Sequence, residues 1–159
     1  MKRYLLLSAV VVAALAFPGV ASAQSGHFVT GGANAPSCTD IGTQVTCEGK
    51  VAGLGGTTFE ITIVAEGIAS VECTNPGGNV APGQDTSVTV AGTTEPQPTP
   101  RSGQTPFTIT SDNPEPLPPT PTCPNEMWTP NIVDVTFTEA TLTLLEDGVQ
   151  SDQIVVPVT

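Results

Sequence analysis

The sequence predicts an all-β protein: a single antiparallel, immunoglobulin-like β-sandwich of six to eight strands with two disulfides. Along much of the chain threonine alternates with valine, isoleucine, leucine and phenylalanine, which is the period-two pattern of strands with one solvated face. No stretch shows the periodicity of an amphipathic helix. Four cysteines behind a secretion signal indicate two disulfides. A small β-barrel is the alternative architecture.

Residues 1–23 have the pattern of a secretory signal peptide. Lys2 and Arg3 form a basic start, and the apolar run that follows, 5–17, is too short to span a bilayer. Ala21-Ser22-Ala23 is a small-residue cleavage site. We therefore expect a secreted protein.

Beyond the signal we expect one domain. Residues 24–35 are rich in glycine, serine and asparagine and predict a flexible N-terminal arm, whereas residues 36–159 predict the β-sandwich. Two proline-rich loops, at 95–104 and 111–125, interrupt the strands. No cysteine for lipid attachment follows the cleavage site, and no second apolar stretch is long enough to span a bilayer, so we expect no membrane anchor.

The chain is strongly acidic, with 15 acidic and 4 basic residues and a formal net charge of −11. Loss of the signal, which holds two of the basic residues, changes the net charge to −13. One histidine (His27), one lysine (Lys50) and one arginine (Arg101) remain. Because so few cations cannot neutralise a row of phosphates, nucleic-acid binding is excluded, and an anionic membrane surface is disfavoured as a partner.

The first long strands follow directly from the alternation. Residues 45–52 predict one strand, which the glycines at 53–56 end. From Phe59 to Cys73 the inward positions keep one phase, which favours a single long strand bent at Gly67. A hairpin at Glu66-Gly67 is the competing interpretation.

The middle of the chain is dominated by turns. Glycine, proline and asparagine at 75–84 indicate tight turns, and Val88 and Val90 then indicate a short strand. Residues 95–124 are so rich in proline that they can hold at most one edge strand, which we expect at 105–110.

The last part of the chain predicts two strands joined by a hairpin turn at Glu146-Asp147-Gly148. The inward positions change parity between Phe137 and Leu142, so a bulge or turn must fall at 138–140. The residues expected to point inward are Val133, Val135 and Phe137, then Leu142 and Leu144, and in the closing strand Ile154, Val156 and Val158.

Four cysteines allow three pairings, of which we favour Cys38 with Cys47 and Cys73 with Cys123. The first pair closes a short hairpin, and the second ties two loops together. On the chain-entropy model these bridges contribute roughly 3 and 4 kcal/mol. A zinc site is not expected, because the sequence has no Cys-x-x-Cys pair and the compartment oxidises thiols.

Three blocks are similar to a group of small exported actinobacterial proteins. The blocks are residues 49–55, residues 73–84, and Cys123-Pro124-Asn125-x-x-Trp128-Thr129-Pro130 running into 134–138. The resemblance covers most of the mature chain; it implies an exported β-domain and assigns no activity or site. In composition and architecture alone the chain also resembles neocarzinostatin-type apoproteins, which carry a small apolar chromophore in a cleft. That likeness implies a carrier hypothesis and no residue roles.

The side-chain inventory does not predict an enzyme. His27 is the one imidazole and lies near the start of the mature chain, where it cannot be held as a base, and the cysteines are expected in bridges. Acidic residues in or beside turns could bind calcium, but their spacing matches no calcium loop, so no metal or cofactor is expected. These acids are Asp40, Glu146, Asp147 and Asp152.

We expect instead a non-catalytic domain that binds, or has a structural role, through its loops. For Trp128 the favoured interpretation is packing beside the Cys123 bridge and not ligand binding, but Met127 and Trp128 are still the best candidates for an exposed apolar patch, should one exist. Arg101 is the one basic residue of a proline-stiffened loop. Such an arginine could be the residue that a protease inhibitor presents to a trypsin-like enzyme; the other interpretation is an ordinary charged residue in a loop. The expected partner is a protein or a cell-envelope component. The alternative is a carrier of a small apolar ligand in a cleft of the sandwich.

Overall fold

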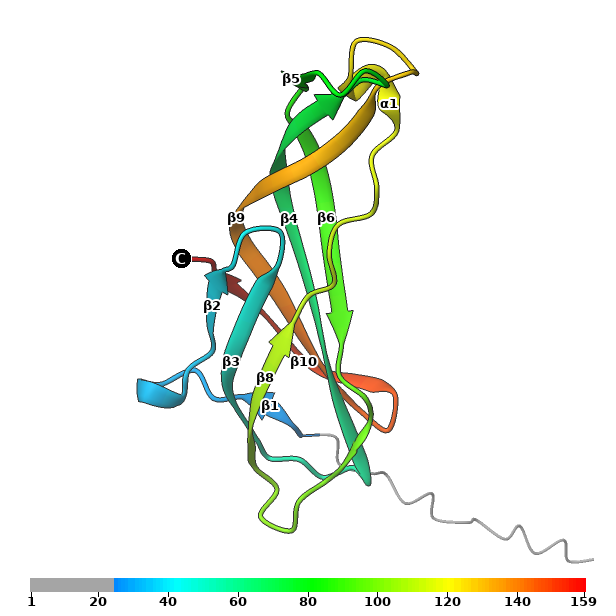
Figure 1. Cartoon of the computed structure of the whole chain (residues 1–159). Helices are drawn as coiled ribbons and strands as arrows, with labels where there is room; N and C mark the ends of the chain where they lie inside the picture. Colours follow the sequence, from blue (N-terminus) through cyan, green and yellow to red (C-terminus); the bar gives the residue numbers. More distant parts are fainter. Residues whose placement is uncertain (1–24) are drawn as a thin grey trace, which may run out of the picture.

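Two long neighbouring strands, β4 (Thr58–Thr74) and β9 (Thr129–Glu146), form the spine of the structure and pair antiparallel along their whole length (Figure 1). This computed structural model describes residues 25–159, so the expected signal peptide lies outside the described residues. Within 25–159, ten strands form two antiparallel sheets packed as a sandwich without barrel closure, which confirms the predicted fold class.

The larger sheet is built around this spine. Strand β10 (Val149–Pro157) pairs with β9 on the side away from β4. Along the other edge of β4 lie three short strands, placed end to end, that together act as one interrupted edge strand. They are β5 (Val80–Pro82), β6 (Thr86–Thr93) and β7 (Gln97–Pro98).

The smaller sheet is centred on β3 (Val45–Ala52), with β8 (Thr105–Thr110) along one edge. Strands β1 (His27–Phe28) and β2 (Ser37–Asp40) share the other edge, and a 3₁₀ turn, η1 (Gly32–Asn34), lies between them. This sheet covers only the lower half of the larger one (Figure 1). The upper half of β4 and β9 extends beyond it, accompanied by the proline-rich segment 111–125 and the short helix α1 (Pro119–Thr122).

The core lies between the two sheets and is filled by the inward-facing side chains of alternate residues. Phe28 of β1 meets Phe107 of β8 edge to face, with ring centroids 5.6 Å apart. Facing them, β4 and β9 supply a row of fully buried aliphatic residues: Ile61, Ile63, Leu142 and Leu144. The alternation of threonine with apolar residues thus produces one buried and one solvated face along the longer strands β4, β6 and β8.

Backbone hydrogen bonds join the sheets at both edges. Thr159 accepts from the Asp40 N–H and donates to the Cys38 carbonyl, both at 3.1 Å. At the opposite edge the Asp112 N–H donates to the Ala91 carbonyl at 2.7 Å. These bonds satisfy polar groups that an isolated strand edge would leave unpaired.

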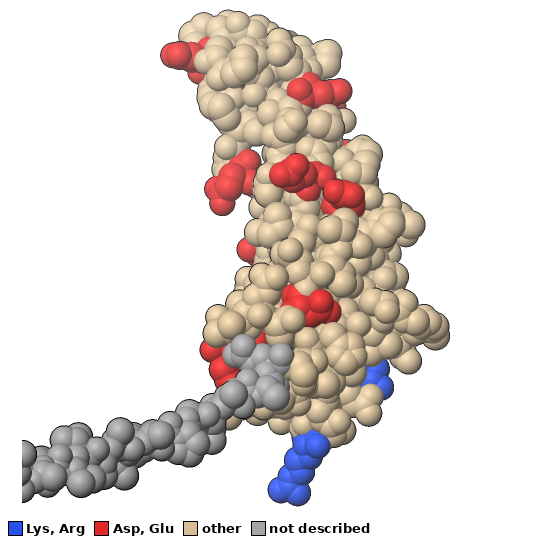
Figure 2. Space-filling model, turned by 180° about the vertical axis from the view of Figure 1, so that it is seen from behind, with Lys and Arg blue, Asp and Glu red and all other residues tan. Residues whose placement is uncertain are grey.

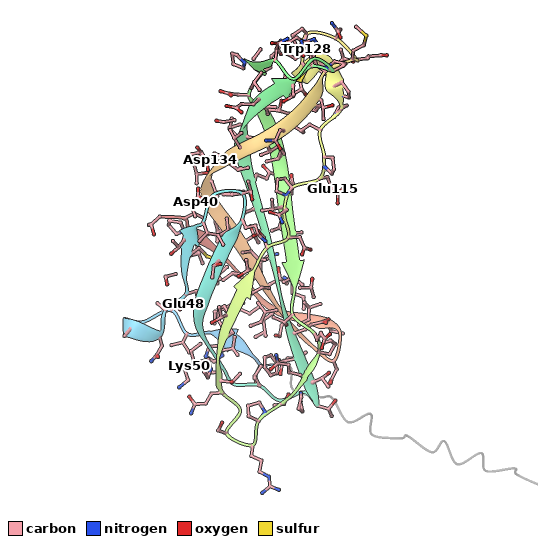
Figure 3. The ribbon with its side chains drawn as sticks, viewed as in Figure 1. Asp40, Glu48, Lys50, Glu115, Trp128 and Asp134 are labelled. Carbon is pink, nitrogen blue, oxygen red and sulfur yellow. A yellow bond between two sulfur atoms is a disulfide. The ribbon has the colours of Figure 1, made fainter. Side chains whose placement is uncertain are left out.

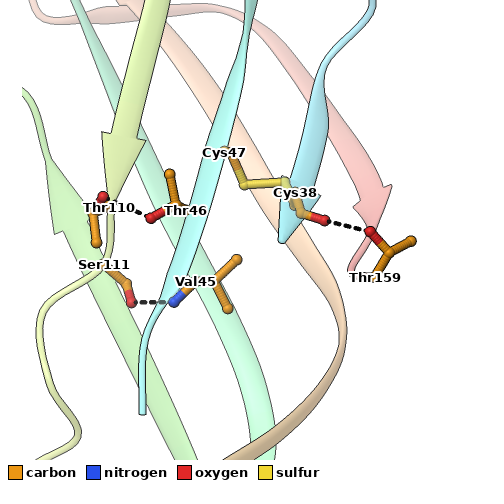
Figure 4. The surroundings of a disulfide bond; sticks show 7 residues. All are labelled: Cys38, Val45, Thr46, Cys47, Thr110, Ser111 and Thr159. Atoms are coloured by element: carbon orange, nitrogen blue, oxygen red, sulfur yellow. Dashed lines mark hydrogen bonds between the residues drawn. A yellow bond between two sulfur atoms is a disulfide. The ribbon is translucent and has the colours of Figure 1, made fainter. Parts of the chain in front are cut away.

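Both disulfides pair as predicted. Cys38 and Cys47 are direct cross-strand partners on β2 and β3, and Figure 4 shows this bridge beside the bonds from the Thr159 hydroxyl to Cys38 and from the Val45 N–H to Ser111. Cys73 at the end of β4 is bonded to Cys123, which follows α1. All four cysteines are therefore used.

The predicted single strand through Gly67 is confirmed and the competing hairpin at Glu66-Gly67 is absent, because β4 runs through both residues; a register shift falls between them. Glu66 pairs with Glu139 and Gly67 with Phe137, so Thr138 is the extra residue of a bulge, where the parity change placed it. A Cβ atom on Gly67 would lie 2.6 Å from Val135 Cγ1 and 2.8 Å from Phe137 Cδ1. Glycine is needed here so that the bulged strand can approach closely.

The predicted hairpin turn is also present. Glu146 pairs with Val149, which leaves Asp147 and Gly148 as a two-residue loop. Their φ angles are 49° and 79°, the positive values that a type I′ turn requires and that the Asp-Gly pair favours.

Three expectations were wrong in part. Ten strands replace six to eight, because β1, β5 and β7, of two or three residues each, are too short to show alternation. The expected arm at 24–35 contains β1, whose Phe28 is only 2% exposed, so this stretch joins the core instead of remaining free. The segment 95–124 holds the predicted edge strand β8, but also β7 and α1.

Val133 was predicted to point inward and is instead 47% exposed. The cause is a second register shift: Ser70 pairs with Asp134 and Val71 with Ile132, so Val133 has no partner on β4. One extra residue reverses the facing of the strand, and half-buried Ile132 takes the inward position.

The bulge yields a stability prediction. The Gly67→Ala variant should lose about 1–3 kcal/mol of unfolding free energy, because the new methyl group overpacks Val135 and Phe137. Urea unfolding measures this loss. The control is Gly31→Ala, where φ is −125° and a Cβ meets no atom within 4 Å; its free energy should stay within about 0.5 kcal/mol of the wild-type value. Equal stability of both variants would contradict the close approach at Gly67.

Limited proteolysis tests the topology. Arg101 is exposed in a turn closed by the Gly103 N–H and the Pro100 carbonyl, whereas Lys50 lies within β3 and pairs with β8. Trypsin should therefore cut the native mature chain after Arg101.

Mass spectrometry should find the two pieces still joined, one water heavier than the intact chain, because Cys73 and Cys123 lie on opposite sides of the cut. Reduction should separate them. Pieces that separate without reduction would contradict the pairing, and earlier cutting after Lys50 would contradict the fold.

Candidate functional site

The loops at the upper end of the spine form the candidate site, which we call the tip: residues 75–85 and 119–128 (Figure 1). The Cys73–Cys123 disulfide joins these two loops at their base. Because β4 ends at Thr74, next to Cys73, and β9 begins at Thr129, the tip is carried directly on the two strands of the spine.

Backbone hydrogen bonds fix the loops around the disulfide. The Gly83 N–H donates to the Val71 carbonyl at 2.7 Å, and the Gln84 N–H donates to the Thr122 carbonyl at 2.9 Å. A Cβ atom on Gly83 would lie 2.9 Å from Cys73 Sγ, so the absence of a side chain lets this loop lie against the bridge. The two loops therefore form one cross-linked unit.

Asparagine side chains close the individual turns. Asn75 Oδ1 accepts the Asn79 N–H at 2.9 Å, and the turn passes through Gly78, whose φ is +81°. In the other loop Asn125 Oδ1 accepts the Met127 N–H at 3.0 Å, while the Asn125 carbonyl accepts the Trp128 N–H at 3.2 Å. Such bonds from a side chain to the backbone two to four residues on are the reason that asparagine favours turns.

The tip presents apolar side chains to solvent. Met127 is 71% exposed and Val80 59%, the highest values among the exposed large hydrophobic residues together with Val155. A hollow of about 180 Å³ lies between the two loops, lined by Pro82, Thr122 and Pro124 among others. The tip therefore exposes two large apolar side chains on fixed loops, which makes it the candidate contact surface.

Met127 and Trp128, the two residues predicted for an exposed apolar patch, differ in their exposure. Met127 is exposed as predicted. Trp128 lies at the top of the molecule (Figure 3) but is half-buried and packs against the core, which includes Cys123, in agreement with the favoured interpretation. Sequence reasoning missed Val80, because it follows a dense run of turn residues and gives no pattern of its own.

Arg101 lies far from the other two candidates. Its loop follows β7, where Pro98 pairs with Thr58 at the start of β4, whereas Thr129, next to Trp128, pairs with Thr74 at the end of β4. Seventeen residues of strand separate these ends, roughly 50 Å. One surface cannot contain all three predicted residues.

The one fully buried acid of the described chain, Glu146, lies at the lower end and has a structural role. Its Oε1 accepts the N–H groups of Gly55 and Gly56 at 2.7 and 3.0 Å, and its Oε2 accepts that of Gly26 at 2.8 Å. Burial alone would raise the pKa of Glu146, but the backbone donors at Gly56, Gly55 and Gly26 outweigh it and lower the pKa below its ordinary value.

Asp147, the next residue, is exposed and fixes the same loop. Its carboxylate accepts the Thr57 hydroxyl and the N–H groups of Thr58 and Thr57. These bonds lower the pKa of Asp147 to about 2. The two neighbouring carboxylates therefore hold the glycine-rich loop at 53–58 onto the β9–β10 hairpin.

Other residues considered for chemistry are also placed. His27 is exposed on β1, with Nδ1 3.1 Å from the Ser25 carbonyl oxygen. Asp40 binds the N–H groups of Gly42 and Phe137, and Asp152 binds that of Phe28. Within residues 25–159 no three histidine, cysteine or acidic residues are placed so that they could hold one metal ion.

Comparison of the chain with family models, with curated proteins and with solved structures found no match. Among residues 25–159, no helix has the length and apolar character needed to cross a membrane.

The carboxylate of Glu146 yields a prediction on pH. A folded-state pKa below the ordinary value stabilises the fold above that ordinary value, and the contribution is lost as the pH falls through the folded-state pKa. Glu146 and Asp147 both shift downward, so the unfolding free energy should fall between about pH 5 and pH 2.

The Glu146→Gln variant tests the assignment. An amide offers only one oxygen and turns an N–H₂ group toward a backbone donor, so at pH 7 we expect a loss of about 1–3 kcal/mol in urea unfolding. The variant should also lose less stability than the wild-type protein between pH 7 and pH 3. Glu48→Gln, at an exposed position of β3, is the control and should match the wild-type protein at pH 7. An unchanged acid dependence in Glu146→Gln would contradict the role of this carboxylate.

Proposed function

We propose that the protein is a secreted, non-catalytic domain that binds a partner at or beyond the cell surface through its tip. The observation that carries this proposal is the exposure of Met127 and Val80 on loops that a disulfide and asparagine-closed turns hold in place. Burying such side chains in an interface gains the hydrophobic contribution, roughly 25 cal/mol per Å² of apolar surface.

Fixed loops support binding through a second physical term. A loop that is ordered before association loses less conformational entropy when the partner arrives, so more of the contact energy becomes affinity. The spine adds reach, because β4 and β9 carry the tip beyond the smaller sheet (Figure 1). A domain that displays its contact surface at one end is suited to a partner on another surface.

Location and charge agree with this role. Two disulfides are compatible with an extracellular protein, and the signal pattern at 1–23 favours export. Acidic side chains are spread over the face seen in Figure 2, while the basic ones lie at the lower end, away from the tip. The net charge favours solubility and a neutral or basic partner.

The carrier hypothesis has less support. The buried apolar side chains between the sheets are at most 8% exposed, so a ligand could enter the sandwich only if the sheets separated. Native mass spectrometry of protein from its own culture medium is the direct check: the mass of the 136-residue chain less four hydrogens supports a binding domain, and a bound small molecule supports a carrier.

Matched surface variants test the tip. The pair Val80→Ser and Met127→Ser, made together, should reduce binding of labelled protein to washed cells and envelope fractions of the producing organism at least tenfold. The control pair is Val155→Ser and Ile41→Ser, of 59% and 53% exposure, which lie away from the tip on β10 and in the β2–β3 turn. All four positions are exposed, so stability should change by less than about 0.5 kcal/mol per site. Equal binding of the two variants, or no binding of the wild-type protein, would contradict the proposal.

A further inference from the structure

A groove crosses the middle of the molecule, at the level where the smaller sheet ends. We call it the waist groove; its volume is about 290 Å³. Three segments far apart in the sequence enclose it: the β2–β3 turn with Thr43, the proline-rich segment with Pro114, Pro116 and Leu117, and the start of β9 with Pro130 and Ile132. It is separate from the tip.

Hydrogen bonds hold these three walls in position. The Val135 N–H donates to the Gly42 carbonyl at 3.0 Å and fixes the β2–β3 turn on β9. The Thr43 hydroxyl donates to Asn113 Oδ1 at 2.9 Å, and the neighbouring Asp112 is bonded to β6 through its N–H. The groove is therefore formed before any partner arrives.

The lining is mixed: Leu117, Ile132 and three prolines are apolar, whereas Asn113, Asn131 and Thr43 contribute polar side chains. Leu117 and Ile132 are half-buried, so each still offers part of its side chain to the groove. Pro114, Pro116 and Pro130 have no N–H, and their carbonyls can only accept. A partner that brings an apolar side chain together with hydrogen-bond donors would complement this surface.

Acidic residues neighbour the lining of the waist groove: Glu115 stands between Pro114 and Pro116, and Asp134 follows two residues after Ile132. Figure 3 shows Glu115 on one side and Asp134 and Asp40 on the other, at about the same height, while Lys50 lies well below them. Glu115 and Asp134 are exposed. Exposed carboxylates thus lie close to two walls of the groove, the proline-rich segment and β9, which favours cationic groups at both ends of a bound segment.

We propose that the waist groove binds an exposed segment of another protein in which lysine or arginine residues flank an apolar side chain. The groove volume of about 290 Å³ is enough to hold one or two side chains of such a segment. A second copy of the chain does not fit, because its mature sequence has only Lys50 and Arg101, on different strands and loops, as cations.

A titration of the isotope-labelled mature protein, followed by amide signals in NMR, tests the proposal. The probe is the blocked peptide acetyl-Lys-Ala-Leu-Ala-Lys-amide, with acetyl-Glu-Ala-Leu-Ala-Glu-amide as its opposite in charge. The lysine peptide should shift the amide signals of Thr43, Asn113 and Ile132 at millimolar concentration or below. The glutamate peptide should leave them unchanged.

Charge variants provide the second readout. Glu115→Lys with Asp134→Lys should weaken binding of the lysine peptide at least tenfold. Glu48→Lys with Glu95→Lys, two exposed positions outside the groove with the same change in net charge, should weaken it less than threefold. An equal loss of affinity for the lysine peptide in both double variants would show that net charge alone controls binding, and would contradict a specific site at the groove.

Other outcomes also overturn the proposal. Binding of the glutamate peptide with similar strength would remove the cationic requirement, and shifts confined to the tip would move the contact elsewhere. Shifts that follow protein concentration alone would indicate a second copy as occupant. No shift at 5 mM lysine peptide would show that the groove does not take such a segment, and would leave the proposal for the tip intact.

Discussion

The antiparallel pairing of β4 with β9 is the constraint on which the rest of the structure depends. It runs from Phe59 opposite Glu146 to Thr74 opposite Thr129, and every other strand of the larger sheet attaches to one of these two. The lower half provides the face on which the smaller sheet packs, and the upper half carries the tip. Two bulges let so long a pair coil without losing its inward face, at the cost of requiring glycine at position 67.

The two ends of this spine have different roles: the lower end contributes to stability, and the upper end carries the candidate contact surface. At the lower end Glu146 and Asp147 use their carboxylates to hold a glycine-rich loop, so the acids that looked available for metal binding serve the fold. At the upper end the disulfide and asparagine-closed turns do the equivalent work, which leaves Met127 and Val80 free in solvent. The functional proposals rest on the surface groups that the fold does not use.

Much of the fold could be predicted from the sequence because the alternation of apolar and polar residues along a strand indicates which side chains face the core. The parity change between Phe137 and Leu142 placed a bulge or turn within 138–140, where the structure has it at Thr138, and Glu146-Asp147-Gly148 identified the hairpin. The second bulge left no comparable mark, since Ile132 and Val133 are both apolar and either could face inward. Phe28 was hidden within a glycine-rich stretch. The separation of Arg101 from Trp128, and the waist groove, follow from the strand ladder that joins distant segments, and local patterns hold no information on that ladder.

The central claim is that the spine ends in a tip whose loops are fixed before any partner binds. Native-state hydrogen exchange of the oxidised protein tests it most directly, through the amides of Gln84 and Asn79, which donate within the tip, and of Gly83, which donates to Val71 of β4. The account predicts that these amides exchange at least a hundredfold more slowly than those of a disordered peptide, and that reduction of Cys73–Cys123 removes the protection at Gly83 and Gln84 while the middle of β4 stays protected. Exchange of all three amides at the rate of a free loop in the oxidised protein would contradict it.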